Sequence, residues 1–134
     1  YSLSNLTIHL QGLYAYIIYF SMGFVKEILK EAPAGAAQVQ KGQHVTVHCT
    51  GFGKDRDLSL KFWSTKDAGQ KPFEFDIGSG NVIKGWDEGV LSMKVGEVAM
   101  IKCTPDYAYG AGGFPAWGIM PNSELHFEIE VLSV

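Results

Sequence analysis

Residues 125–131 read LHFEIEV, and this stretch decides the fold class. Apolar and polar residues alternate along it without a break. Because successive side chains of a strand point to opposite faces of a sheet, the alternation predicts a strand with one buried face and one wet face. Pro105 ends an earlier strand of the same kind, since proline has no amide hydrogen to donate. The same period of two recurs in residues 43–50, 73–77 and 99–103.

One stretch of the chain breaks this period of two. Within it the apolar residues recur every three or four positions, at Val82, Trp86, Val90 and Met93. This spacing predicts a short helix with one apolar face over residues 82–93. Gly85 and Gly89 would each weaken an isolated helix by about 1 kcal/mol relative to alanine, so packing against the sheet must hold it. The predicted fold class is α+β, an antiparallel β-sheet wrapped around one short α-helix.

The size and composition of the chain are those of one globular domain. It has 134 residues, of which 46% are hydrophobic and 19% are charged. A core of normal density is therefore possible without disulfides or metal. The formal net charge of −3 and the scattered basic residues argue against nucleic acid as a partner. Phosphate binding draws on clustered Lys and Arg, which the chain lacks.

The usual catalytic motifs are absent from the sequence, including the nucleophile elbow, HExxH and the phosphate loop. His44, His48 and His126 fall on the polar faces of predicted strands, where solvated histidines are the default rather than metal ligands. Asp87 and Glu88 would project in different directions from a helix, which disfavours paired acid–base chemistry. We expect no metal and no cofactor.

Residues 1–21 differ from the rest of the chain because they contain no Lys, Arg, Asp or Glu. Their apolar stretch, residues 13–20, is far shorter than the ~20 residues of a membrane-spanning helix. No basic flank precedes it and no clear small-residue cleavage site follows it. We expect residues 1–21 to be a leader or upstream extension outside a domain that occupies residues 22–134. The alternative is a genuine targeting or membrane-associating extension.

Aromatic residues are concentrated in the loops. Residues 106–118 read DYAYGAGGFPAWG, and Phe62 with Trp63 lies at the end of another loop. Loops this rich in aromatic residues cannot bury them all locally. They either cover a core or line an apolar pocket, and a rigid apolar pocket with a few polar groups is a ligand site by default. Composition alone leaves both interpretations open.

The order of the motifs resembles the FKBP-type immunophilins. VTVHCTG, KFWST, KPFEFDIGSGNVIKGWDEGV, VGEVAMIKC, TPDYAYGAGGFPAWG and ELHFEIEVL follow one another in register from about Val25 to the C-terminus. VIKGWDEG and DYAYG are the most specific of these, and KFWST and GAGGFPAWGI are similar to the small, single-domain cytosolic members found in plants. The resemblance implies a sheet-around-helix fold and a monomeric, cytoplasmic peptidyl-prolyl cis–trans isomerase (rotamase) of protein folding, with no membrane association.

The family pocket can be carried over residue by residue. Trp86 would form the floor under the substrate proline ring, the Ile83 amide would donate to the substrate carbonyl, and the Tyr109 hydroxyl would be a second donor. Phe62 and Phe127 complete the implied catalytic set. The implied substrate-binding residues, which line the walls and rim, are Cys49, Trp63, Phe73, Val82, Phe114, Trp117 and Ile119.

The chain departs from the commonest family pattern along this wall. Family members often have Tyr where this chain has Cys49, Asp where it has Trp63, and Arg near Ala68 and Gly69. The Trp63 side chain lacks the acidic acceptor that macrolide drugs use, so binding of tacrolimus or rapamycin stays open. Proline-containing proteins are the implied partners.

The sequence leaves open two alternatives to an enzymatic function. The same pocket could hold a proline-containing partner without turnover, as an adaptor or chaperone module. Alternatively, an unrelated β-rich domain could bury every aromatic residue as core. The missing nucleophile does not argue against an isomerase, because rotation about an X-Pro bond needs no covalent step.

Cys49 and Cys103 are the two cysteines of the chain. Buried thiols in a reducing compartment are the simpler interpretation, since disulfides are rare in the cytosol. Both residues fall on predicted inward faces, however, of strands that the family resemblance implies are close together. A redox-switchable bridge at the pocket wall is the second hypothesis.

Overall fold

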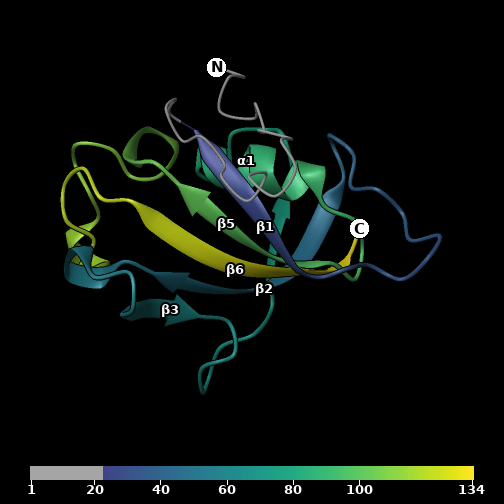
Figure 1. Cartoon of the computed structure of the whole chain (residues 1–134), viewed down its shortest axis with the longest axis horizontal. Helices are drawn as coiled ribbons and strands as arrows, with labels where there is room; N and C mark the ends of the chain where they lie inside the picture. The colour runs from purple at the N-terminus through teal and green to yellow at the C-terminus, as the bar shows by residue number, and fades with distance from the viewer. Residues whose placement is uncertain (1–22) are drawn as a thin grey trace, which may run out of the picture.

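The computed structural model describes residues 23–134, so the expected leader, residues 1–21, lies outside the described residues. The described chain forms one antiparallel sheet with a short helix against one face (Figure 1). The helix, α1, spans Lys84–Gly89. This architecture confirms the predicted α+β class. The strands are β1 (Phe24–Lys30), β2 (His44–Phe52), β3 (Lys61–Ser64), β4 (Phe73–Asp76), β5 (Val98–Cys103) and β6 (Leu125–Ser133).

The central strand of the sheet is β6. The strand order is β1-β5-β6-β2-β3, and β4 pairs with β2 beside this path. Every pairing is antiparallel. Residues of β6 alternate between buried and half-buried, as the LHFEIEV stretch predicts. The strands expected in residues 43–50 and 99–103 are likewise confirmed as β2 and β5.

Two details of the sheet differ from the prediction. Phe62 and Trp63 belong to β3, not to the end of a loop. This strand has four residues, and its adjacent aromatic pair shows no period of two. In β4 the pattern predicted Phe73 on the buried face, but its side chain is 37% exposed. Phe73 faces a cavity rather than the closed core.

The helix is shorter than residues 82–93. α1 has six residues, and a 3₁₀ turn, Val90–Ser92, continues it. Ile83 is the N-cap with extended backbone angles, so the helix begins one residue later. Close packing explains why glycine occupies two positions of the helix. A Cβ on Gly85 would overlap the Cys103 Sγ, and one on Gly89 would lie 2.9 Å from Ile101 Cγ2.

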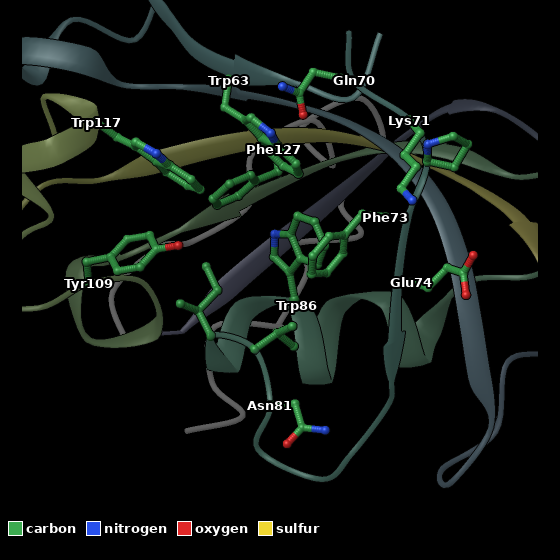
Figure 2. A pocket seen from close by; sticks show the side chains of 13 residues that line it. Trp63, Gln70, Lys71, Phe73, Glu74, Asn81, Trp86, Tyr109, Trp117 and Phe127 are labelled. Carbon is green, nitrogen blue, oxygen red and sulfur yellow. The ribbon is translucent and has the colours of Figure 1, made fainter. Parts of the chain in front are cut away.

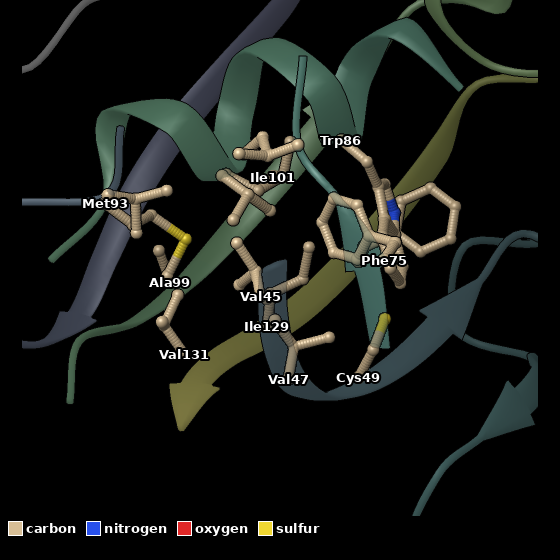
Figure 3. Packing of buried hydrophobic residues seen from close by; sticks show 14 of the residues in the cluster. Val45, Val47, Cys49, Phe75, Trp86, Met93, Ala99, Ile101, Ile129 and Val131 are labelled. Atoms are coloured by element: carbon tan, nitrogen blue, oxygen red, sulfur yellow. The ribbon is translucent and has the colours of Figure 1, made fainter. Parts of the chain in front are cut away.

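Aliphatic side chains fill one end of the space between the sheet and α1 (Figure 3). Each is fully buried, at 0% exposure, and aliphatic side chains of this kind interdigitate at close to crystalline density. We call this group the aliphatic core. It comprises Val45, Val47, Val90, Met93, Ala99, Ile101, Ile129 and Val131.

Cys49 and Cys103 are buried, unbridged thiols. They lie on β2 and β5, which flank β6 on either side and are not paired with each other. Burial raises the pKa of the Cys49 thiol well above its ordinary value and that of Cys103 to about 12. Both thiols are therefore protonated and slow to react at neutral pH. The redox-switchable bridge stays a prediction. Thiol labelling of unreduced, unfolded protein tests it, and two free thiols would eliminate it.

Within residues 23–134, no helix is both long enough and apolar enough to span a membrane.

Candidate functional site

Aromatic rings enclose a cavity of about 840 Å³ at the other end of the space between the sheet and α1. Figure 2 shows the rings projecting into it from the helix, the strands and the loops. The aromatic lining residues are Trp63, Phe73, Trp86, Tyr109, Trp117 and Phe127. The remaining lining residues are Gln70, Lys71, Pro72, Glu74, Asn81, Val82 and Ile83.

Trp86 forms the floor of this cavity. It lies in the first turn of α1, and its side chain is held edge-on by two neighbouring rings. The Phe73 centroid is 5.5 Å from that of Trp86 at 85°, and the Phe127 centroid is 5.6 Å away at 89°. Edge-to-face pairs of this kind are favourable and directional, so they fix the plane of the floor. The Trp86 Nε1 is buried, so the ring presents carbon rather than a polar atom at the cavity surface, and within residues 23–134 this nitrogen has no hydrogen-bond partner.

The turn before α1 is tied to the helix by Asp87. Its carboxylate accepts hydrogen bonds from the Gly78 amide at 3.0 Å and the Gly80 amide at 2.8 Å. The Ile83 carbonyl accepts from the Trp86 amide at 2.9 Å, closing the first helical turn. Within residues 23–134, the Ile83 amide itself makes no backbone hydrogen bond. A backbone donor beside the floor is therefore available to a ligand.

Tyr109 supplies a polar group to an otherwise apolar wall. It follows the 3₁₀ turn Pro105–Tyr107, which the bond from the Ala108 amide to the Pro105 carbonyl closes at 3.0 Å. The Gly110 amide donates to the same carbonyl at 2.8 Å and so holds the backbone on both sides of Tyr109. Burial is the main cause that raises the pKa of its phenol above the ordinary value, and the nearby Cys49 thiol adds to the rise. The hydroxyl is therefore protonated throughout the neutral range and can donate a hydrogen bond.

A chain of ring contacts runs along the cavity from Trp63, which meets Phe73 of β4 edge-on at 6.1 Å, to Tyr109. Trp63 and Trp117 are stacked, with centroids 5.8 Å apart and planes at 10°. Phe114 meets Trp117 edge-on at 4.9 Å and stacks on Tyr109 at 5.4 Å. We call Trp63, Trp117, Phe114 and Tyr109 the aromatic rim. The rim joins β3 to the segment that connects β5 to β6.

The structure brings most of the predicted site residues to the cavity. Those that line it are Trp63, Phe73, Val82, Ile83, Trp86, Tyr109, Trp117 and Phe127. Phe62 lies outside the lining, edge-on to Phe127 at 5.9 Å. Phe114 also lies outside it, and Cys49 and Ile119 are buried at 1% and 2% exposure. The individual roles of the twelve residues stay predictions.

Sequence reasoning missed most of the polar residues that line the cavity. Gln70, Lys71 and Asn81 line it, and so does Glu74, whose carboxylate Oε1 lies 2.9 Å from His44 Nε2. The signal was present, because Lys71 and Glu74 flank Phe73 in the KPFEF motif. Within residues 23–134, no group of three or more His, Cys, Asp or Glu side chains could hold a metal ion.

Comparison with known proteins identifies the class to which this fold and cavity belong. Residues 35–132 match the model of the FKBP-type peptidyl-prolyl cis-trans isomerases. The chain belongs to this family, as the order of its motifs predicts.

Small plant and fungal proteins are among the curated relatives. The chain is 68% identical over 113 residues to the peptidyl-prolyl cis-trans isomerase FKBP12 of Arabidopsis thaliana, covering 84% of this chain and 99% of that protein. It is 68% identical over 112 residues to the FKBP12 of Vicia faba, covering 83% and 97%. It is 48% identical over 114 residues to the FK506-binding protein 1A of Aspergillus fumigatus, covering 84% and 96%. The predicted likeness to small plant members is confirmed.

Proposed function

We propose that the aromatic cavity accelerates the cis–trans rotation of X-Pro peptide bonds in protein substrates. The chain is a peptidyl-prolyl cis–trans isomerase, since it matches the isomerase family and nearly the whole length of plant relatives named for that activity. One observation carries the assignment of the site. Trp86 is an apolar floor held edge-on by Phe73 and Phe127, with a free backbone amide at Ile83 beside it.

The cavity suits a reaction whose transition state is less polar than its ground state. Rotation about an X-Pro bond crosses a barrier of roughly 20 kcal/mol because it breaks amide resonance. The twisted amide loses charge separation, so an apolar, water-poor wall favours it over the planar amide that water solvates well. A million-fold acceleration needs about 8 kcal/mol of such differential binding.

Two hydrogen bonds would orient the substrate without transferring a proton. The Ile83 amide donates to the substrate carbonyl, and the protonated Tyr109 hydroxyl is a second donor at the rim. Both are neutral groups, so they hold the carbonyl while the floor receives the prolyl ring. Neither a nucleophile nor a metal enters this mechanism.

The same proposal covers partners and location. The chain acts as a monomer in the cytoplasm on proline-containing proteins, and residues 22–134 form the domain. We further propose that a macrolide of the FK506 type binds weakly. Several fungal relatives are named for FK506 binding, but here Trp63 fills the wall with a ring and has no acidic acceptor.

The direct test is the exchange rate of a Leu-Pro-Phe peptide, measured by NMR with the full chain and its Trp86→Ala and Phe127→Ala variants. Exchange far faster than the uncatalysed tens of seconds, and lost in both variants, supports the proposal. Leu58→Ala is the matched control, because Leu58 is 38% exposed and outside the cavity. Binding shifts without faster exchange would instead support the adaptor function, which the likeness to named isomerases does not favour.

A further inference from the structure

The cavity is larger than a prolyl ring requires. At about 840 Å³ it lies in the upper part of the ~300–1,000 Å³ range of pockets that enclose drug-sized ligands. If the prolyl ring rests on Trp86 between Phe73 and Phe127, the space toward Trp63 and Trp117 is left for a neighbouring residue. This step rests on the proposed function, because it takes the floor as the proline site.

The wall of that remaining space is made of indole rings. Trp63 and Trp117 stack at 5.8 Å and 10°, and both line the cavity. Trp63 also meets the floor, with its centroid 6.2 Å from that of Trp86. Trp117 is 37% exposed, so part of its ring is free to contact a ligand. The wall is therefore preformed, rigid and aromatic.

The chemistry of the cavity differs from one side to the other. Figure 2 shows Trp63 and Trp117 together on one side and Lys71 with Glu74 on the opposite side. Charged side chains are thus kept away from the indole wall. Aromatic pairs gain energy beyond their buried area, because the positive edge of one ring meets the negative face of another. A saturated ring of the same size has no such quadrupole.

We propose that Trp63 and Trp117 form a subsite that selects substrates with an aromatic side chain next to the proline. The two indoles discriminate between an aromatic ring and an aliphatic group of equal size. This specificity is carried by the pair and is separate from the catalytic floor at Trp86.

The test compares phenylalanine with cyclohexylalanine, which has nearly the same shape but no π-system. NMR exchange measures kcat/KM of the full chain for peptides carrying each residue immediately before, or immediately after, the proline. We expect phenylalanine to be preferred about two- to tenfold at one of these positions. In Trp117→Leu the ratio falls to about one, whereas Trp117→Phe keeps most of it.

Three controls make the outcome decisive. Leu58→Ala, on an exposed loop outside the cavity, keeps the wild-type ratio. Far-UV circular dichroism checks that each variant is folded, and the 37% exposure of Trp117 makes this the expected result. Equal rates for phenylalanine and cyclohexylalanine at both positions, with catalysis intact, overturn the subsite and leave the isomerase. An absence of catalysis for all peptides overturns the proposed function itself.

Discussion

The aliphatic core and the aromatic cavity occupy opposite ends of one space, between the same sheet and the same helix. At the core end, Met93 and Val131 are fully buried. At the cavity end, Phe73 and Trp117 are each 37% exposed around an opening of about 840 Å³. Aliphatic side chains fill the core end at close to crystalline density, whereas at the other end the rings line an open cavity although Trp86 and Phe127 are only 4% and 2% exposed. The two ends therefore differ in how completely their side chains fill the space.

The boundary between the two regions falls inside single elements. The helix contributes Trp86 to the cavity, and the turn that continues it contributes Val90 to the core. Strand β6 likewise contributes Phe127 to the cavity and Val131 to the core. The core can thus hold the cavity walls rigidly, because both belong to the same backbone segments. We expect substitutions at the two ends to separate stability from catalysis.

The largest effect on stability is expected at the core end. Met93→Ala removes a fully buried side chain and should lower the free energy of unfolding by about 3 kcal/mol, through lost burial and the remaining cavity. Urea unfolding measures it. Ile28→Ala, at a position 41% exposed, is the control and should cost less than about 0.5 kcal/mol. Similar losses of unfolding free energy in Met93→Ala and Ile28→Ala would contradict the assignment of Met93 to a closed core.

A second substitution tests the close approach of α1 to β5. Gly85→Ala should cost about 2 kcal/mol by overpacking, despite the ~1 kcal/mol that alanine gains in a helix. The new Cβ would overlap the Cys103 Sγ and lie 3.1 Å from the Tyr107 carbonyl oxygen. In a Cys103→Ala background the loss should fall by more than half. Gly112→Ala, with no atom within 4 Å of its Cβ, should be neutral. An unchanged loss in the Cys103→Ala background would rule out this contact as the cause.

At the cavity end, Tyr109→Phe should slow isomerisation about fivefold by removing one hydrogen-bond donor, with little change in stability. The pH profile adds a second readout. Because the pKa of Tyr109 is raised above 10.0, the donor is retained as pH rises, and the wild-type rate should stay level from pH 6 to about pH 9. A fall between pH 7 and pH 9 in wild type that disappears in Tyr109→Phe would contradict the raised pKa.

The smallest effect on stability is expected at His44, on the solvent-exposed face of the sheet beside Glu74. Hydrogen bonds to Glu74 and then Asp76 raise the pKa of His44 above 6.5. The charged ring therefore adds stability that is complete below pH 6.5 and is lost as pH rises through the raised pKa. His44→Gln should lower Tm slightly at pH 5.5 and leave it unchanged at pH 9. Because the pair is exposed, salt should reduce the difference. A difference that persists at pH 9 would exclude this origin.

Sequence periodicity predicts the elements whose burial is one-sided and misses those whose burial is not. The alternation in β6 is visible because every second side chain is buried. Strand β3 was missed because Phe62 and Trp63 are adjacent and both half-buried, one behind the rim and one in it. The end of the helix was overestimated because Val90 keeps the apolar spacing while the backbone tightens into a 3₁₀ turn.

For the site, motif order predicts the rings better than the polar groups. Trp86 and Tyr109 lie in specific motifs, and both line the cavity. Lys71 was not predicted, because a lysine beside a strand is usually a solvated residue. Cys49 lies on the expected inward face, but its 1% exposure keeps it out of the lining. A one-dimensional pattern tells which face a residue is on, but not whether another ring covers it.

One measurement tests most directly whether the aromatic end performs the catalysis while the aliphatic core provides stability. It is the X-Pro exchange rate of a Leu-Pro-Phe peptide with the Trp86→Leu and Met93→Ala variants. The temperature is one at which circular dichroism shows that both variants are folded. The account predicts that Trp86→Leu lowers kcat/KM at least tenfold, from a loss of about 1.4 kcal/mol or more of transition-state binding. Met93→Ala should keep the wild-type value despite its lower stability. Equal losses in both variants, or full activity in Trp86→Leu, would contradict the claim that the aromatic end alone performs the catalysis.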